Sequence, residues 1–377
     1  MRPKRLRTWI ALLLLALLLI GFTSYVGAIW SQSDPIINVE ANLSQPATRS
    51  PALVVDSALR EAGFPGALYS SNEYDLVAEK VQDSRDPKEI TIGVTSRQVD
   101  AIDMPDVVSL GTIGEQPLMI LARGDAAPWT SPADLHGLRV QIGPPGSIAN
   151  EVGTELLAQF GVTSSNSVFL QDKTSEASMS LIKGESDAML ALYSPEDTTL
   201  APLVGRDDVH FVPTPATQAA AGHIGSVIAG SIPQGAVSVI DNVPSQDIPS
   251  ISIPITVIAN SSISRAAAFR IAAALDYQFS RGTVLSPPGK FPNFDQELLA
   301  DPSAAEYYSG GVIPWEYRTF SAPVADLFIP IAVIGSIMLI VFSVYGVLVP
   351  SLMEMWTTVI RPQMKARGKR RDNEEST

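Results

Sequence analysis

A short turn between a strand-like and a helix-like segment is the first place in this sequence where chemistry is expected. Alternating apolar residues over 138–142 predict a strand, and Gly143 to Ser147 read as a turn rich in glycine and proline. Apolar residues over 148–160 then recur at helical spacing, and Gly161 ends the helix. Backbone N–H groups and the helix dipole favour an anion at such a helix N-terminus.

Two residues of this turn are candidates for ligand contacts. Gly146 lets a ligand approach the backbone closely, and the Ser147 hydroxyl either caps the helix or donates to a carboxylate. The turn is not a P-loop, because no lysine follows the glycines, and prolines replace the glycine pattern of a dinucleotide fingerprint. Taken alone, the turn favours an ordinary strand–helix connection with a serine cap.

Other catalytic and metal-binding patterns are missing from the sequence. It has no cysteine, and its histidines, His136, His210 and His223, are not at metal-ligand spacing. It contains neither a GxSxG nor an HExxH motif, so we expect no enzyme activity, no cofactor and no metal. The net charge of −13 without a basic stripe argues against nucleic acid as a partner.

Two uncharged apolar runs predict membrane spans. Basic residues precede the first run and follow the second, which puts both termini in the cytoplasm and the main domain on the extracytoplasmic (periplasmic) side of the cell (inner) membrane. A cleaved signal peptide is the alternative for the first run. The predicted order is a cytoplasmic N-terminus (1–7), a span (8–30), the outer domain (31–323), a span (324–350) and a basic cytoplasmic tail (351–377).

Strand and helix patterns alternate through the outer domain, which predicts an α/β fold. The expected strands are 36–41, 89–94, 107–110, 118–122, 168–170, 188–192 and 251–259, and the expected helices are 51–62, 73–81, 175–183 and 263–279. A turn is expected between residues 110 and 118, and Pro254 suggests an edge strand or a break.

Polar segments over 125–135 and 242–249 are interpreted as crossovers between two lobes. Lobe one would comprise residues 31–124 and 250–323, and lobe two residues 125–249. Such an arrangement makes a hinge with a cleft, where small ligands bind.

Several stretches resemble the TAXI group of solute-binding proteins, which serve TRAP transporters. They are SPADLHGLRVQIGPPGSIANEVGTELLAQFGV, VSLGTIGEQPLMILAR, LIKGESDAMLAL, and the C-terminal GKFPNFDQELLADPSAAEYYSGGVIPWEYRTFSAPVADLFIPIAVI, which resembles the tail of membrane-anchored members. The resemblance implies a type II periplasmic-binding-protein fold, two α/β lobes with a hinge, here with two transmembrane helices. It also implies a membrane-tethered solute-binding protein that takes a small organic anion, such as an amino acid or carboxylate, and works with TRAP-type permease subunits.

The resemblance also suggests where ligand contacts lie. The expected ligand-binding residues are Gly146 and Ser147 on one lobe, Thr95, Ser96 and Arg97 on the other, and Tyr193 and Ser194 after a strand that ends at the cleft. Arg97 is expected to pair with a carboxylate. The glycine-rich, aromatic loop of the family is replaced by ANLSQPATRSPALVV. Two alternatives therefore stay open: a tethered structural or sensory partner with a degenerate site, and a binding protein for an ABC-type importer.

The segment before the second apolar run is rich in aromatic residues. Residues 295–308 are too acidic to lie wholly at a membrane surface, so we expect them to pack back on the nearer lobe. Trp315, Tyr317 and Phe320 are expected to form an aromatic belt at the membrane surface.

Overall fold

The computed structural model forms two compact units, one of Ser33–Ala322 and one of Met1–Gln32 with Pro323–Thr377. It describes residues 20–25, 27–28, 31–71, 76–124, 129–192, 194, 200, 202–203, 206–294 and 298–343. Most of the predicted span 8–30 and the end of the span 324–350 lie outside these residues. Within the described part, no helix combines the length and the apolar character needed to cross a membrane.

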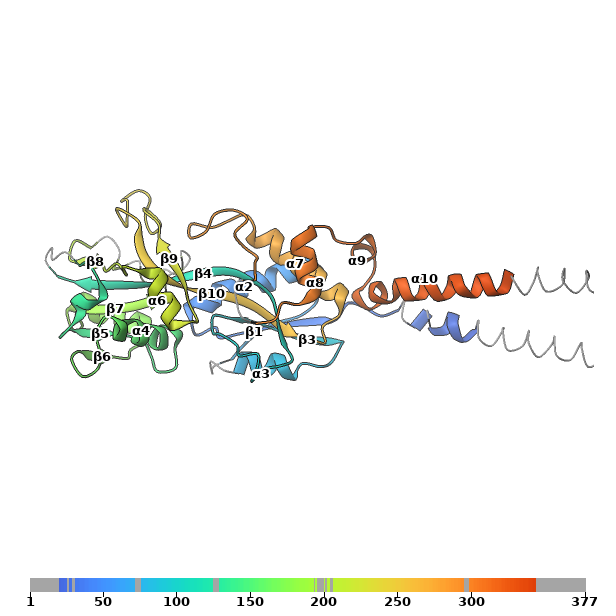
Figure 1. Ribbon diagram of the computed structural model, residues 1–377, viewed down its shortest axis with the longest axis horizontal. Helices are drawn as coiled ribbons and strands as arrows, with labels where there is room; N and C mark the ends of the chain where they lie inside the picture. Colours follow the sequence, from blue (N-terminus) through green and yellow to red (C-terminus); the bar gives the residue numbers. More distant parts are fainter. Residues whose placement is uncertain are drawn as a thin grey trace, which may run out of the picture. The chain divides into compact units, whose positions relative to one another are not determined.

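A mixed ten-stranded sheet organises the described residues of the larger unit (Figure 1). Its strand order is β2-β1-β3-β10-β4-β7-β5-β6, with β8 paired to β4 and β9 paired to β10. The strands are β1 (Ile36–Ala41), β2 (Leu68–Ser70), β3 (Glu89–Thr95), β4 (Val107–Arg123), β5 (Arg139–Gln141), β6 (Val168–Leu170), β7 (Ala188–Leu192), β8 (Val209–Phe211), β9 (Ile228–Ile232) and β10 (Ile248–Asn260). We call β2, β1 and β3 with the adjoining ends of β10 and β4 the first part, and β7, β5, β6 and β8 with the other end of β4 the second part.

Helices pack against both parts of this sheet, as the alternating sequence pattern predicted. The helices of this unit are α2 (Pro46–Glu61), α3 (Leu76–Asp83), α4 (Ile148–Gln159), α5 (Thr174–Lys183), α6 (Thr217–Ile224), α7 (Arg265–Phe279), α8 (Pro302–Gly310) and α9 (Trp315–Thr319), with a 3-10 turn, η1, at Pro132–Leu135. Helix α10 (Ala322–Ser343) belongs, apart from its first residue, to the smaller unit. Helix α2 begins one turn earlier than expected, because Pro46 rather than Pro51 occupies its first turn.

Strand β4 is continuous, and the turn predicted between residues 110 and 118 is wrong. Thr112 and Gly114 pair with β10, and two register shifts place extra residues on β4 as bulges. Gly111 has φ +130° beside one of these shifts, a conformation that side-chain-bearing residues rarely adopt. The glycines that indicate a turn in the sequence are therefore what lets a long strand bend against its partner.

Strand β10 is central in the sheet order, but Pro254 lies at a break in its pairing, one of the two arrangements that the sequence suggested. On one side β10 pairs with β4 along most of its length. On the other side its ladder with β9 ends at Ser252, and its ladder with β3 begins at Thr256. Pro254 lies in this interval, where a missing N–H removes no bond from either ladder.

Strand β4 takes part in both parts of the sheet, and the crossovers interpreted at 125–135 and 242–249 stay predictions. Gln116 and Pro117 of β4 still pair with β10, whereas Leu118 to Ala122 pair with β7. The sequence pattern missed this because a strand that serves both parts has no polar break. The division into lobes at residues 124 and 249 stays a prediction.

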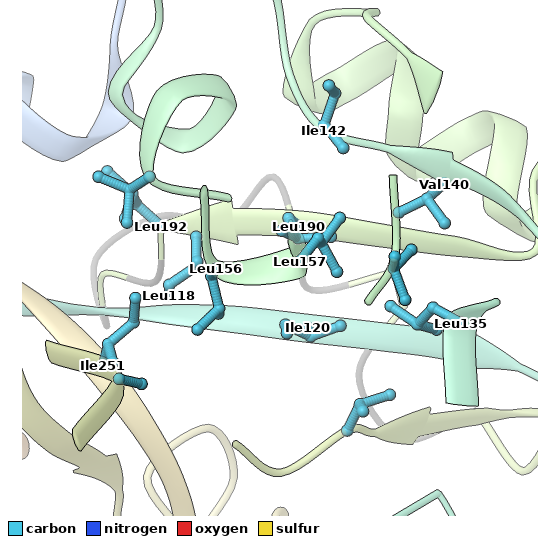
Figure 2. Close-up of a cluster of buried hydrophobic side chains, with 14 of the residues drawn as sticks. Leu118, Ile120, Leu135, Val140, Ile142, Leu156, Leu157, Leu190, Leu192 and Ile251 are labelled. Carbon is cyan, nitrogen blue, oxygen red and sulfur yellow. The ribbon is translucent and has the colours of Figure 1, made fainter. Parts of the chain in front are cut away.

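The second part of the sheet has a hydrophobic core on each face. Leu156 and Leu157 of α4 pack with Leu118 and Ile120 of β4 and with Leu190 of β7 (Figure 2). The opposite face of the same strands packs against α5 in a second cluster. Burying each such leucine stabilises the fold by roughly 1.5–3 kcal/mol relative to exposure. The loops at the strand ends therefore rest on a rigid three-layer support.

The segment after α7 packs on the first part of the sheet, as expected for the described part of 295–308; that this part is the one nearer a membrane stays a prediction. Thr112 and Asn293 exchange two backbone hydrogen bonds, and Ser109 bonds to Leu299 and Asp301. This covers the edge of β4 that faces away from β10. Helix α8 then lies against α7, with the ring of Tyr307 edge-on to that of Phe269.

The membrane-surface aromatic belt is wrong for Tyr317. Its side chain is buried, and its ring packs edge-on against Phe269 at 5.4 Å between centroids. Trp315 is 53% exposed and contacts Phe320. Tyr317 therefore belongs to the core around α7, which the local sequence pattern does not reveal.

Candidate functional site

A pocket of about 410 Å³ lies between residues that follow β1 and the strand ends of the second part. Leu190 and Leu192 of β7 form an apolar part of its lining, and Ala149 and Ala177 add to it. The polar lining comes from three loops that lead into helices. It comprises Ser44, Gln45, Arg49, Gly143, Pro144, Ser147, Asp172, Lys173, Thr174 and Ser175. An apolar floor with a polar rim is typical of a small-molecule site.

Three helices begin at this pocket. The N-cap residues of α2, α4 and α5 are Gln45, Ser147 and Lys173, and all three line the pocket. Ser147 caps α4, whereas neither Gln45 nor Lys173 makes a side-chain hydrogen bond to its helix. Each helix N-terminus carries roughly half a positive charge on amide groups that lack an intrahelical partner. Three converging termini favour an anion in the pocket, although α4 and α5 each carry a glutamate in the first turn, Glu151 and Glu176.

The charged side chains of the pocket add to this potential. Arg49 and Lys173 line it, and Asp172 is the acidic residue of the lining. Arg49 donates from Nε to the carbonyl oxygen of Leu43 at 2.8 Å, which holds its stem beside the pocket. Asp172 accepts from the amide of Gln141 at 2.7 Å. Two cations and three helix termini outweigh one hydrogen-bonded carboxylate, so the arrangement suits an anion.

The predicted turn lies at the pocket, but its serine has a structural role. Ser147 Oγ accepts from the backbone N–H of Asn150 at 3.2 Å and donates to the carbonyl oxygen of Pro144 at 2.7 Å. Its hydroxyl proton is therefore used within the turn. Gly143 and Gly146 have φ +88° and +76°, which glycine adopts without strain. Gly143 lines the pocket, and the carbonyl of Gly146 points to Arg97.

Thr95, Ser96 and Arg97 lie across from this turn, as predicted, but around a smaller cavity of about 10 Å³. Thr95 and Ser96 are buried. Arg97 donates from Nη2 to the Gly146 carbonyl at 3.1 Å and to Glu151 Oε1 at 2.9 Å. The geometry thus pairs Arg97 with a carboxylate of the protein. Whether it also contacts a ligand stays a prediction.

Tyr193 and Ser194 are the remaining two residues that the sequence predicted to bind a ligand. Ser194 is buried after β7, and Tyr193 lies outside the described residues. Of the predicted residues on opposite sides of the cleft, the structure joins Arg97 to Gly146 by a hydrogen bond. Ligand contacts for all seven residues stay predictions.

Sequence reasoning missed most of the polar lining. Ser44, Gln45 and Arg49 come from the stretch that stands in place of the glycine-rich loop of the TAXI group. Asp172 and Lys173 stand between the strand 168–170 and the helix after it. A useful signal was available: each set follows a strand and precedes a helix, as Gly143 to Ser147 do. Parallel strands bring such loops to one edge of the sheet.

A family model matches part of this chain. Residues 98–217, less than half of the chain, match the family described as NMT1/THI5 like. No curated protein matches the chain. The TAXI family does not emerge from these comparisons and stays a prediction.

Solved structures with a similar arrangement share little sequence with this chain. An ancestral arginine-binding protein bound to arginine is 13% identical, covering 67% of this chain and 96% of its own, with a TM-score of 0.41. The periplasmic aliphatic sulphonate-binding protein SsuA from Escherichia coli is 14% identical, covering 65% and 74%, with a TM-score of 0.38. The BenM effector-binding domain with benzoate is 11% identical, covering 70% and 100%, with a TM-score of 0.44.

Proposed function

We propose that this chain is a membrane-tethered extracytoplasmic solute-binding protein whose pocket takes a small organic anion. The observation that carries the proposal is the meeting of three helix N-termini with Arg49 and Lys173 around one pocket. Backbone amides at a helix terminus bind carboxylate, sulfonate or phosphate oxygens without a dedicated cation. The volume of about 410 Å³ falls within the roughly 300–1,000 Å³ typical of small-ligand sites.

The pocket is built for binding rather than for catalysis. The hydroxyls of Ser44 and Ser147 are bonded within their own turns, and the acidic residue Asp172 is bonded to Gln141. Within the described residues, no group of histidine, aspartate or glutamate side chains gathers as a metal site would need. An anion held by amides and two cations is retained and released unchanged, which is the task of a transport or sensory protein.

A panel of paired compounds tests this proposal. Small carboxylates and sulfonates are compared with their neutral amides by thermal unfolding of the purified chain. Binding to the native state stabilises it by RT ln(1 + L/Kd), where L is the free ligand concentration, so the unfolding temperature rises with the logarithm of the ligand concentration above Kd. We expect stabilisation by at least one anion and none by its amide. Equal stabilisation by both members of every pair would contradict an anion site.

We propose more specifically that the chain delivers its bound anion to a TRAP-type permease. This proposal is supported by the sequence resemblance and by the basic residues outside both apolar runs, 8–30 and 324–350. Two tethers would hold the binding domain beside one permease at high effective concentration. Reporter fusions at Asn42 and Thr377 test the topology. We expect phosphatase activity at the first position alone, and activity at the second would contradict it.

A tethered sensory or structural protein is a second candidate, favoured by one specific observation. Arg97 and Ser147, both expected to bind a ligand, form hydrogen bonds within the protein. If the anion panel gives no stabilisation, this candidate replaces the first.

A further inference from the structure

One arginine connects the two parts of the sheet across the cleft. Arg97 follows β3 in the first part, and its guanidinium reaches the start of α4 in the second. Nη2 lies 3.1 Å from the carbonyl oxygen of Gly146 and 2.9 Å from Oε1 of Glu151. The Arg97 side chain is 28% exposed and that of Glu151 44%. We call this set of contacts the strap.

Local backbone structure orients both groups that form the strap, the Arg97 side chain and the Gly146 carbonyl. Thr95 Oγ1 accepts from the backbone N–H of Arg97 at 3.0 Å, which folds the chain back after β3. On the other side, Gly146 has φ +76°, and this left-handed conformation directs its carbonyl at the guanidinium. Arg97 and Gly146 both lie in short turns next to β3 and α4. The position of the strap is therefore set by these two turns.

The strap separates a closed side of the cleft from an open one. A cavity of about 10 Å³ lies beside Arg97, lined by Val77 and Val94 of the first part and Ile148 of the second. Beyond Gly146 the pocket of about 410 Å³ is lined by Lys173 and other residues at the start of α5. The two parts are therefore in contact at the strap and apart at the pocket.

The sheet is narrowest between these two parts. The ladder of β10 with β9 ends at Ser252 and that with β3 begins at Thr256. In the interval, around Pro254, β10 pairs with β4 alone. Two paired strands with adjacent bulges bend more easily than a full sheet, so this interval is the natural hinge. A contact across the cleft then acts on the angle at this hinge.

We propose that the strap holds the empty protein closed on the Arg97 side and sets how readily the cleft opens. Glu151 keeps Arg97 on the protein, so a ligand has to be recognised by Arg49, Lys173 and the helix termini instead. A partly exposed ion pair changes a two-state population by roughly two- to five-fold and is weakened by salt. Release of the strap would lower the fraction of closed molecules. If the closed form binds the ligand, the apparent Kd rises by the factor by which that fraction falls.

Distance measurements on the empty, full-length chain test the strap. The sequence has no cysteine, so two introduced cysteines carry spin labels without background. Tyr69 of β2 and Val168 of β6 are exposed and lie on the outermost strands of the sheet. With labels there, Glu151→Gln should shift or broaden the distance distribution. High salt should do the same in the unsubstituted chain.

The matched control is Asp187→Asn, which breaks an ion pair to Arg139 of 2.7 Å inside the second part. This variant should leave the distances unchanged. Exchange of charges, Arg97→Glu with Glu151→Arg, should restore much of the original distribution. Identical distributions for the unsubstituted chain and Glu151→Gln would overturn the strap, as would an equal change in Asp187→Asn.

The consequence for ligand binding rests on the proposed function, but the strap itself does not. The distances are measured without ligand, so failure of every anion to bind would leave this test intact. If an anion does bind, Glu151→Gln should speed its dissociation two- to five-fold, in line with the loss of one exposed ion pair. An unchanged dissociation rate together with unchanged distances would overturn both the strap and its regulation of the pocket.

Discussion

The hydroxyl of Tyr308 donates to the carbonyl oxygen of Leu110 at 2.9 Å and lies directly over the next residue, Gly111. A Cβ atom built at Gly111 would lie 3.1 Å from that hydroxyl oxygen. This contact fixes α8 against β4, and β4 is the strand that runs through both parts of the sheet. The segment after α7 is thereby an integral piece of the larger unit.

Gly111→Ala should destabilise the domain by about 1–3 kcal/mol, because the new methyl group meets Tyr308 and the backbone has φ +130°. Urea unfolding of the purified chain measures this loss. Gly137→Ala is the matched control, since Gly137 has φ +83° but open space around its Cβ. A loss no greater than that of the control would show that the contact with Tyr308 contributes nothing.

Tyr307 should make the domain sensitive to alkali. Burial, together with nearby Asp276, raises the pKa of Tyr307 to about 12 from its ordinary 10.0. Between these values the unfolded chain has lost the phenolic proton and the native chain has kept it. The free energy of unfolding therefore falls as the pH rises through this window.

Tyr307→Phe should remove this part of the alkaline slope, although it also loses the hydrogen bond to Asp276. Urea unfolding at about pH 9 and about pH 11 measures the slope. Tyr277→Phe is the control, because Tyr277 is 62% exposed. Equal slopes in Tyr307→Phe and the unsubstituted chain would contradict the buried position of the ring.

Ser147→Ala should cost about 1 kcal/mol of stability, because it removes the cap of α4. Its effect on anion binding should be small, since the hydroxyl proton already goes to Pro144. Ser264→Ala removes an equivalent cap from α7, far along the chain from the pocket, and should cost a similar amount. Unchanged stability with lost anion binding would instead make Ser147 a ligand donor.

The parts of the fold that follow local patterns could be predicted from the sequence. The strands at Ile36–Ala41 and Ala188–Leu192 have the expected bounds, because buried strands there carry unbroken apolar or alternating runs. β4 could not be predicted as one strand, since Gly111 and Pro117 indicate a turn until the pairing with β10 is known. Long-range pairing overrode local turn signals there.

The sequence predicted where the candidate site lies in the fold, but not which side chains line it. The turn ending in Ser147 does lie at the pocket, because its strand–helix pattern is local. Arg97 was expected to bind a ligand, but its partner is Glu151, more than 50 residues away in the sequence. Lys173 and Arg49 carry no motif. Only the meeting of three helix termini distinguishes them from ordinary exposed cations.

Replacement of Ser175 measures the central claim, an anion held at these helix termini, most directly. Ser175 is exposed in the first turn of α5 and lines the pocket. Ser175→Glu should keep or raise stability, because a carboxylate suits a helix N-terminus. The same carboxylate should repel the anion. Calorimetric titration with the tightest-binding carboxylate or sulfonate should show a Kd raised at least roughly tenfold over Ser175→Gln, the size of a close like-charge effect. Equal affinity in Ser175→Glu, Ser175→Gln and the unsubstituted chain would contradict an anion site in this pocket.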